Sequence, residues 1–350
     1  MVVIKRVLMI FLSFVPAILL SQQKKTYNIQ TVAFYNLENL FDTIDDPLTF
    51  DNDRTPKGRY HWTDKLYKEK LQNMALVISK IGKEHTGSAP AILGVAEIEN
   101  RKVLEDLIKE PILIQNKYGI IHKDSPDRRG IDVGLLYQKD RFKPKHFKTY
   151  ELYLYDEVTQ KRVYTRDQLI VSGYLDGDLI HCIVNHWPSR RGGETRSAYK
   201  RKKAAKLNKR IIDSIFVLDP YSKIITLGDF NDDPDSASLK KVLGVTSKRM
   251  DTDLKELYNP LAKMKNKGVG THAWNDSWTI FDQIIVSKEL LQEDYSSYRF
   301  YKVGIFSEAF LITTTGRYKG YPFRSFSGQN YVGGYSDHLP VYMYLIKEKR

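Results

Sequence analysis

Short apolar runs alternate with amphipathic segments along most of the chain, which predicts a mixed α/β protein. Seven runs have the length of buried strands, several are rich in β-branched residues, and they end in polar residues or glycine. They are Ile29–Tyr35, Ala91–Ala96, Asp132–Tyr137, Leu179–His186, Lys223–Leu227, Ile280–Ser287 and Pro340–Ile346. Strands and helices do not alternate strictly, so we expect packed sheets with helices outside rather than a dinucleotide-binding fold.

Two amphipathic helices are predicted between these strands. The first lies between a possible cap at Thr63 and a stop at Gly82, with apolar residues at helical spacing: Tyr67, Leu71, Met74, Ile78 and Ile81. The second follows Thr195, and its stripe of Ala204, Leu207, Ile211 and Ile215 faces away from many Lys and Arg residues. Neither GxGxxG after a strand nor GxxxxGK[ST] occurs in the sequence, so the usual phosphate loops of nucleotide cofactors are missing.

Residues 1–21 have the pattern of a secretory signal peptide. Lys5 and Arg6 precede an apolar run from Val7 to Leu20, which is shorter than the ~20 residues that cross a bilayer. We expect cleavage near Ser21, export to the periplasm or beyond, and no stable membrane anchor; an uncleaved anchor is the alternative. No repeat or Gly/Ser linker divides residues 26–350, which predicts one domain.

The charge and the cysteine content limit the kinds of partner and metal site that we expect. The chain has 55 Lys and Arg against 42 Asp and Glu, a net charge of +13 that favours polyanionic partners. Its one cysteine, Cys182, excludes an intramolecular disulfide, a CxxC motif and a cysteine cluster for iron and sulfur. Metal chemistry would therefore need carboxylates, amides or histidines.

Polar and acidic residues recur just where apolar strands end, which is where α/β sheets usually bind ligands. Five strand ends carry them, with the sequences FYNLE at 34–38, GVAE at 94–97, VNHWP at 184–188, LGDFN at 227–231 and YSDHLP at 335–340. A further acid, Asp282, lies inside a predicted strand. An unpaired carboxylate there would cost several kcal/mol, so Asp282 should have a partner.

Each of these residues also has a structural explanation. Gly228–Asn231 could be a plain turn, Glu97 a surface acid at a helix start, Asp282 a hydrogen-bond acceptor, and His186 and His338 structural histidines. A calcium loop from Asp229 is disfavoured, because Pro234 and Lys240 stand where glycine and glutamate are needed. The whole set favours chemistry instead: oxygen donors suited to Mg²⁺, with Mn²⁺ as an alternative, from Asn36, Glu97, Asp229 and Asp337.

The motifs occur in an order that resembles the endonuclease/exonuclease/phosphatase superfamily, the DNase I-like proteins. The matching features run from Asn36 to Pro340: a first-strand asparagine, a strand-end glutamate, His-x-x-Pro, Gly-Asp-x-Asn, a late strand aspartate and Ser-Asp-His. The segments 41–47 and 185–193 further resemble bacterial members described as endonucleases. This resemblance implies a four-layer sandwich of two packed β-sheets flanked by helices, with residues 26–350 as the catalytic domain.

The resemblance also implies a role for each matching residue. Glu97 would be the main Mg²⁺ ligand, with Asn36, Asp337 and Glu38 around it. Asp229 and Asn231 would contact the attacking water and the scissile phosphate. His338, paired with Asp282, would orient or deprotonate the water, and His186 would act as an acid or stabilise charge. A phosphate-contacting residue between Asp124 and Tyr137 is not assigned; Arg129 and Asp132 lie near the expected place.

The substrate prediction depends on a basic segment after the His186 strand. From Arg190 to Arg210 there are ten Lys and Arg residues and one acid, Glu194, which favours contact with nucleic-acid backbones over a plain solvated helix. Arg190 and Arg191 are the expected phosphate contacts. The main hypothesis is therefore a metal-dependent endonuclease, with DNA as the favoured partner.

Alternative functions remain open at this point. A sphingomyelinase-like or inositol-phosphate phosphoesterase would use the same centre, and a late aromatic stretch, from Tyr318 to Tyr331, could dock on membranes or pack internally. A non-enzymatic polyanion-binding protein is disfavoured by the full set of carboxylates and histidines. DNA against RNA, endo- against exonucleolytic cleavage, metal preference and oligomeric state are not determined.

Overall fold

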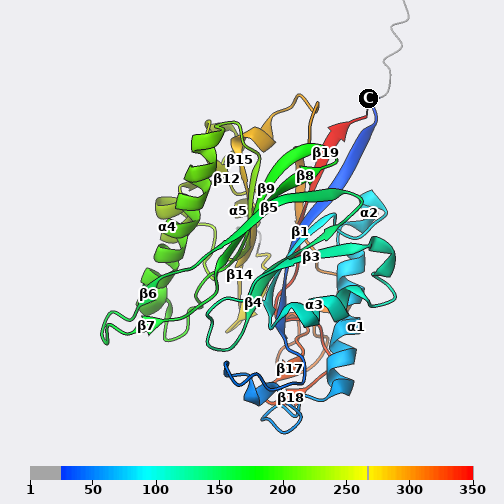
Figure 1. The fold of residues 1–350 in the computed structure, drawn as a ribbon, viewed down its shortest axis with the longest axis vertical. Coiled ribbons are helices and arrows are strands. Elements are labelled where there is room, and N and C mark those ends of the chain that lie inside the picture. The colour runs from blue at the N-terminus through cyan, green and yellow to red at the C-terminus, as the bar shows by residue number, and fades with distance from the viewer. Residues whose placement is uncertain (1–24, 266–267, 350) are drawn as a thin grey trace, which may run out of the picture.

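Two β-sheets pack face to face, with helices on both outer sides (Figure 1). The structure is a computed structural model that describes residues 25–265 and 268–349. The expected signal peptide, residues 1–21, lies outside the described residues. The architecture confirms the predicted four-layer α/β sandwich.

The first sheet has six strands in the order β16-β19-β1-β2-β4-β3. Their bounds are β1 (Tyr27–Leu40), β2 (Ile92–Ile98), β3 (Tyr118–His122), β4 (Asp132–Gln138), β16 (Arg299–Ile305) and β19 (Val341–Glu348). The central pair, β1 and β2, is parallel, and β19 runs antiparallel to β1. The parallel pair therefore brings the ends of two apolar strands to one edge.

The second sheet has seven strands in the order β11-β12-β15-β10-β9-β8-β5. Their bounds are β5 (Phe142–Tyr150), β8 (Gln168–Leu175), β9 (Asp178–His186), β10 (Ile224–Asp229), β11 (Val245–Thr246), β12 (Leu257–Tyr258) and β15 (Asp282–Ser287). Three small hairpins accompany the sheets: β6 (Leu154–Tyr155) with β7 (Arg162–Val163), β13 (His272–Trp274) with β14 (Ser277–Thr279), and β17 (Phe326–Ser327) with β18 (Asn330–Tyr331).

The helices cover the outer faces of the sheets. They are α1 (Asp64–Lys80), α2 (Lys83–Thr86), α3 (Arg101–Ile108), α4 (Glu194–Leu218) and α5 (Ala262–Lys265), with short 3₁₀ or π turns elsewhere. Figure 1 shows α1 and α3 beside the first sheet and α4 beside the second. Among the described residues, no helix is both long and apolar enough to cross a membrane.

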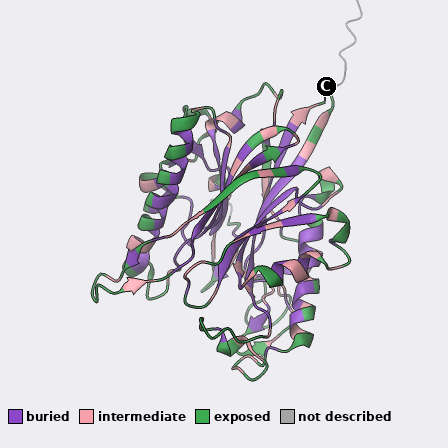
Figure 2. Ribbon diagram, viewed as in Figure 1, coloured by how far each residue is buried: buried purple, intermediate pink, exposed green. Residues whose placement is uncertain are grey.

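Three apolar layers separate the four structural layers. Phe34, Val184 and Leu227 belong to the layer between the sheets. A second layer packs α1 and α3 on the first sheet, and a third packs α4 on the second sheet. Figure 2 shows the inner faces of the helices buried and their outer faces exposed. Burial of these stripes against the sheets explains the apolar spacing along α1 and α4.

The seven predicted strands and both predicted helices are present, with small shifts at their ends. The strand predicted from Ile280 is wrong by two residues, because β15 begins at Asp282. The carbonyl of Phe281 lies before the strand and accepts a hydrogen bond from the N–H of Phe230, the first residue after β10. The sequence patterns did not predict β3, β5, β8 and β16.

The late aromatic stretch divides between two environments. Phe326 is buried and contacts the ring of Trp62, as does Tyr331. Tyr318, in contrast, is 41% exposed. Internal packing therefore explains the later part of the stretch but not its beginning.

Candidate active site

The polar ends of three neighbouring strands of the second sheet lie side by side. Asp229 is the last residue of β10, and it is in register with His186, the last residue of parallel β9. On its other side Asp229 is in register with Asp282, the first residue of antiparallel β15. The pairing of the strands alone therefore places two carboxylates and one imidazole in a row.

Two residues of the first sheet meet this row from the opposite side. Asn36 of β1 is fully buried, and its Nδ2 donates to Asp229 Oδ2 at 3.3 Å. Glu97 of β2 has Oε1 at 3.8 Å from His186 Nε2, while its Oε2 accepts from the N–H of Asn39 at 3.0 Å. Glu97 also has a positive φ of 58°, a conformation that fixes the direction of its side chain. The site thus lies between the two sheets.

Asp282 and His338 form a buried pair. His338 Nδ1 lies 2.7 Å from Asp282 Oδ2, and His338 Nε2 lies 4.0 Å from Asp229 Oδ2. Burial alone would lower the pKa of His338, but the carboxylates of Asp282, Asp229 and Asp337 outweigh it and raise this pKa well above its usual value. These carboxylates thus favour the charged form of His338, and Asp282 has the partner that its position required.

Burial shifts the pKa values of both Asp229 and His186. Burial, with Asp282 and Glu97 close by, raises the pKa of Asp229 to about 7. Burial and the charges of Arg166 and Arg129 hold the pKa of His186 well below its usual range. His186 is therefore neutral, and its buried Nδ1 has no hydrogen-bond partner among the described residues.

Asn231 is held beside Asp229 by its own backbone. It has a positive φ of 50°, its N–H donates to Asp229 Oδ1 at 2.9 Å, and its Nδ2 donates to the carbonyl of Trp187 at 3.0 Å. The segment after β10 is thus a turn, as one of the two interpretations of Gly228–Asn231 predicted. That turn also orients the carboxylate of Asp229 toward the site.

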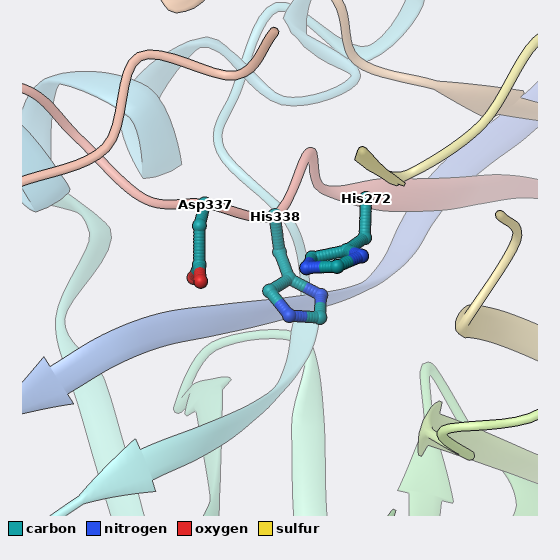
Figure 3. A group of neighbouring side chains, drawn as sticks. All are labelled: His272, Asp337 and His338. Carbon is teal, nitrogen blue, oxygen red and sulfur yellow. The ribbon is translucent and has the colours of Figure 1, made fainter. Parts of the chain in front are cut away.

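Asp337 lies next to this group but is paired with an arginine. Its Oδ2 accepts from Arg324 at 2.6 Å, and the pKa of Asp337 falls to about 2 because His338 and Arg324 outweigh the effect of its burial. Figure 3 shows Asp337 beside His338, whose ring lies near that of His272. The ring centroids of the two histidines are 4.9 Å apart.

A cavity of about 310 Å³ opens above these residues. Its lining includes Glu97, His186, Asp229, Asn231 and His338. Four cationic side chains line it as well, which are Arg129, Arg166, Arg191 and Lys200. Because cations and the catalytic group line one cavity, it suits an anionic substrate that reacts beside the acids.

The sequence analysis missed Arg166. Its guanidinium is 6% exposed, pairs with Asp127 Oδ2 at 3.0 Å and donates to the carbonyl of Trp187 at 2.8 Å. Arg166 lies two residues before β8, a strand that the sequence pattern did not predict. Recognition of β8 would have placed Arg166 at a strand end beside His186.

Among the other predicted or nearby residues, the structure shows which ones line the cavity and which ones do not. Arg129 lines the cavity, whereas Asp132 is buried against His122 at 3.0 Å and Ser125. Arg191 lines the cavity, but Arg190 does not. Arg190 is held by Glu194 at 2.9 Å and by two further acids, and its Nε donates to the carbonyl of Asn231 at 2.9 Å.

The donor set fits a hard divalent cation. Asn36 lies 3.3 Å from Asp229, and Glu97 lies 3.8 Å from His186, which is itself 3.5 Å from Asp229, so these three residues offer oxygen ligands around one imidazole. Glu38 instead accepts from the N–H of Ser325. A bound cation stabilises a buried carboxylate such as Asp229 in its charged form. Asp337 could join them by exchanging its bond to Arg324.

The comparisons with known proteins agree with this fold. The structure resembles D. rerio TDP2 complexed with single strand DNA product, with a TM-score of 0.52 and 12% identity, covering 91% of this chain and 98% of that one. It also resembles an endonuclease/exonuclease/phosphatase family protein from Bacteroides thetaiotaomicron, with a TM-score of 0.54 and 18% identity, covering 93% of this chain and 100% of that one.

A third solved structure has a similar fold. It is a mannosyl-6-phosphatase, also from Bacteroides thetaiotaomicron, with a TM-score of 0.52 and 18% identity, covering 90% of this chain and 99% of that one. No curated protein matches the sequence. Residues 31–347 match the model of the Endonuclease/Exonuclease/phosphatase family, and the chain belongs to that family.

Proposed function

We propose that this chain is a metal-dependent phosphodiesterase that cleaves nucleic acid internally, with DNA as the favoured substrate. The observation that supports this most directly is the lining of the cavity of about 310 Å³. His338 Nε2 and Asp229 Oδ2 lie 4.0 Å apart there, and four cationic side chains line the same cavity. Such a cavity can bind several phosphates of a chain while one of them reacts.

Asp229 is the best candidate for the proton acceptor. Its carboxylate lies at the centre of the group, with Oδ2 3.5 Å from His186 Nε2 and 4.0 Å from His338 Nε2, where it can take a proton from an attacking water. The carboxylates around His338 favour its charged form, in which it would donate a hydrogen bond to the phosphate. The sequence left open whether His338 orients or deprotonates the water; with Asp229 as the base, His338 would orient it.

The remaining residues would bind the phosphate or the metal ion and orient the water. His186 is neutral and would contact the phosphate, while Asn231 would position the water or a phosphate oxygen. Mg²⁺ or Mn²⁺, when bound, would neutralise charge that develops on the phosphate, and Glu97 and Asn36 would hold it, with Asp337 joining them. The reaction needs mainly positioning and charge neutralisation, which this preformed site supplies.

The cationic lining favours a polyanion over a small phosphate ester. Arg166 is paired with Asp127, but Arg129, Arg191 and Lys200 also line the cavity, which is more cations than one phosphate bound near a divalent cation needs. The similarity to a mannosyl-6-phosphatase keeps a sugar phosphomonoester as the competing substrate. Sphingomyelin and inositol phosphates are further alternatives on the same scaffold.

The test is nicking of supercoiled plasmid by the chain from residue 22 onward with Mg²⁺, in parallel with Mn²⁺. EDTA and Asp229→Ala should each abolish nicking, with at least a 100-fold loss for the variant, whose fold is checked by circular dichroism. Intact plasmid together with turnover of mannose 6-phosphate, sphingomyelin or inositol phosphates would overturn the endonuclease proposal in favour of that substrate.

Export is the second part of the proposal. The support is the pattern of residues 1–21, a short apolar run after two basic residues. Mass spectrometry of the mature protein should find a new N-terminus near residue 22. An intact Met1 on mature protein would contradict export by cleavage.

A further inference from the structure

The hairpin of β6 and β7 presents three tyrosines on its outer face. Leu154 pairs with Val163 and Tyr155 with Arg162. Because side chains alternate along a strand, the pair of Leu154 and Val163 points to one face of this ribbon and the next pair points to the other. Leu154 is buried in the apolar layer under α4, with Val163 packed against it. The opposite face carries three rings that are 63%, 53% and 48% exposed, those of Tyr153, Tyr155 and Tyr164.

Arg162 lies among these rings and fixes their arrangement. Its guanidinium carbon is 4.3 Å from the ring centroid of Tyr153, 5.3 Å from that of Tyr164 and 5.8 Å from that of Tyr155. The guanidinium is itself held by Glu151 Oε1 at 2.5 Å and by two backbone carbonyls of the same segment. The three tyrosines, the tyrosine face, therefore form an ordered aromatic surface that is open to solvent.

The tyrosine face is continuous with the catalytic cavity. Tyr164 lines that cavity, together with Leu154 and Val163. A further cavity, of about 250 Å³, lies between the tip of the hairpin and the start of α4. Arg191 and Lys200 line both cavities, so a polyanion bound along these two cations reaches the hairpin. In Figure 1 the hairpin projects from the body of the molecule beside one end of α4.

We propose that the tyrosine face binds unpaired bases of a single-stranded segment next to the scissile phosphate. The inference rests on the proposed function and extends it by a surface for single-stranded nucleic acid. An exposed, ordered ring stacks with the flat face of any base, whereas bases paired in a duplex do not offer that face. Three cations beside the hairpin, Arg191, Arg196 and Lys200, hold the phosphates between these bases.

The surroundings of the tyrosine face favour nucleic acid over a membrane or a sugar. Docking on a membrane needs a contiguous apolar patch, whereas the tip of the hairpin, residues 156–161, contains one apolar side chain, Val158. A sugar ring can stack on a tyrosine, but it has no use for a row of cations beside it. Asp156 and Glu157 also line the cavity at the tip, and Asp156 is engaged by the N–H groups of Val158 and Thr159.

The test measures binding without turnover. Fluorescence anisotropy in EDTA gives dissociation constants for an oligothymidylate of about 12 nucleotides, for a base-free chain with as many phosphates, and for a duplex of that length. The wild-type chain should bind the oligothymidylate roughly 10- to 100-fold more tightly than the base-free chain. Tyr153→Ala/Tyr155→Ala should remove that preference, and it should leave duplex affinity within about twofold because duplex binding depends on phosphates. Tyr153→Phe/Tyr155→Phe, which keeps both rings, should retain the preference.

The matched control is Tyr221→Ala/Tyr301→Ala. It removes two rings that are 62% and 55% exposed and that line neither the catalytic cavity nor the cavity at the hairpin. This variant should keep the wild-type preference for bases. Circular dichroism checks the fold of each variant, and binding to phosphatidylglycerol vesicles is measured in parallel.

Three outcomes would overturn the tyrosine face as a base-binding surface. They are equal affinities of the wild type for the oligothymidylate and the base-free chain, a base preference that survives in Tyr153→Ala/Tyr155→Ala, and a loss in that variant confined to the vesicles. Plasmid nicking reports separately on the proposed function. Intact plasmid with a base preference that depends on the tyrosines would reject the endonuclease and retain the surface, and nicking without any base preference would do the reverse.

Discussion

At the scale of single residues, the charge of His338 depends on one neighbour. Asp282 Oδ2 lies 2.7 Å from His338 Nδ1 and raises its pKa, so Asp282→Asn removes the main support for the charged imidazole. We expect kcat to fall by roughly 100-fold or more with little change in KM. In addition, the alkaline loss of activity should move to lower pH, because His338 gives up its proton more readily. Steady-state kinetics from pH 5 to 10 measure both effects.

The control for Asp282→Asn is Asp294→Asn, which removes an exposed carboxylate paired with Arg299 at 2.6 Å. That variant should keep the wild-type pH profile. A kcat of Asp282→Asn within about threefold of the wild type would contradict a catalytic role for a charged His338.

Arg190 and Arg191 are adjacent in sequence but should behave differently. Arg191 lines the cavity, so Arg191→Ala should raise KM for DNA about tenfold and leave kcat nearly unchanged. Arg190 contacts the carbonyl of Asn231 and buried acids instead, so Arg190→Ala should lower kcat and thermal stability. Kinetics and melting curves of the two variants distinguish the roles; identical KM effects would restore the prediction that both arginines bind phosphate.

At the scale of elements, the turn after β2 contains a buried acid outside the catalytic group. Glu99 accepts a bond from the N–H of Asp42 at 2.7 Å, and burial, with Asp42 and Asp51 nearby, raises its pKa from 4.5 to about 8. Between these values the folded chain keeps a proton that the unfolded chain releases. The free energy of unfolding should therefore decrease as pH rises from about 5 to 8.

Glu99→Gln keeps the acceptor oxygen and removes the ionisation. The variant should be more stable than the wild type at pH 8, by on the order of 2 kcal/mol, and similar to it near pH 5. Urea unfolding at the two pH values measures the difference. The same pH dependence in both proteins would show that Glu99 is not the group responsible.

The elements also explain how much the sequence could predict. Apolar runs predicted the central strands, and polar residues at their ends predicted Glu97, His186 and Asp229, because strand pairing brings such ends together. β5 is an edge strand with many exposed positions, so it lacks an apolar run. Arg166 was missed because its position depends on the packing of β8, which no local pattern contains. Lys200 was part of the predicted basic segment, but its place at the cavity depends on the packing of α4.

At the scale of the whole molecule, the net charge of +13 is not spread evenly around the site. The ten basic residues from Arg190 to Arg210 divide into groups with different neighbours. Arg190 and Arg201 pair with the buried Asp232, whereas Arg191 and Lys200 line the catalytic cavity. Lys202, Lys203, Lys206 and Lys209 lie on the exposed face of α4, which continues away from the cavity.

This division predicts where the salt dependence of DNA cleavage arises. Lys209 is nine residues beyond Lys200, about 14 Å along the helix, so the outer lysines should contact DNA weakly during cleavage. The double variant Arg191→Ala/Lys200→Ala should lower kcat/KM by roughly 10- to 100-fold. It should also flatten the dependence of log affinity on log salt by about 0.9 per lost contact with duplex phosphate.

The matched control replaces the four outer lysines, Lys202, Lys203, Lys206 and Lys209, with alanine. It removes twice as much charge as the double variant, so a response governed by net charge would be larger in the control. A response governed by position would be larger in the double variant. We expect this result because, of the six residues replaced in the two variants, Arg191 and Lys200 line the cavity and the four outer lysines do not. Cleavage rates and DNA affinities between 50 and 300 mM NaCl decide between the two. A larger loss in the quadruple variant would mean that the long basic face of α4, rather than the wall of the cavity, binds the substrate.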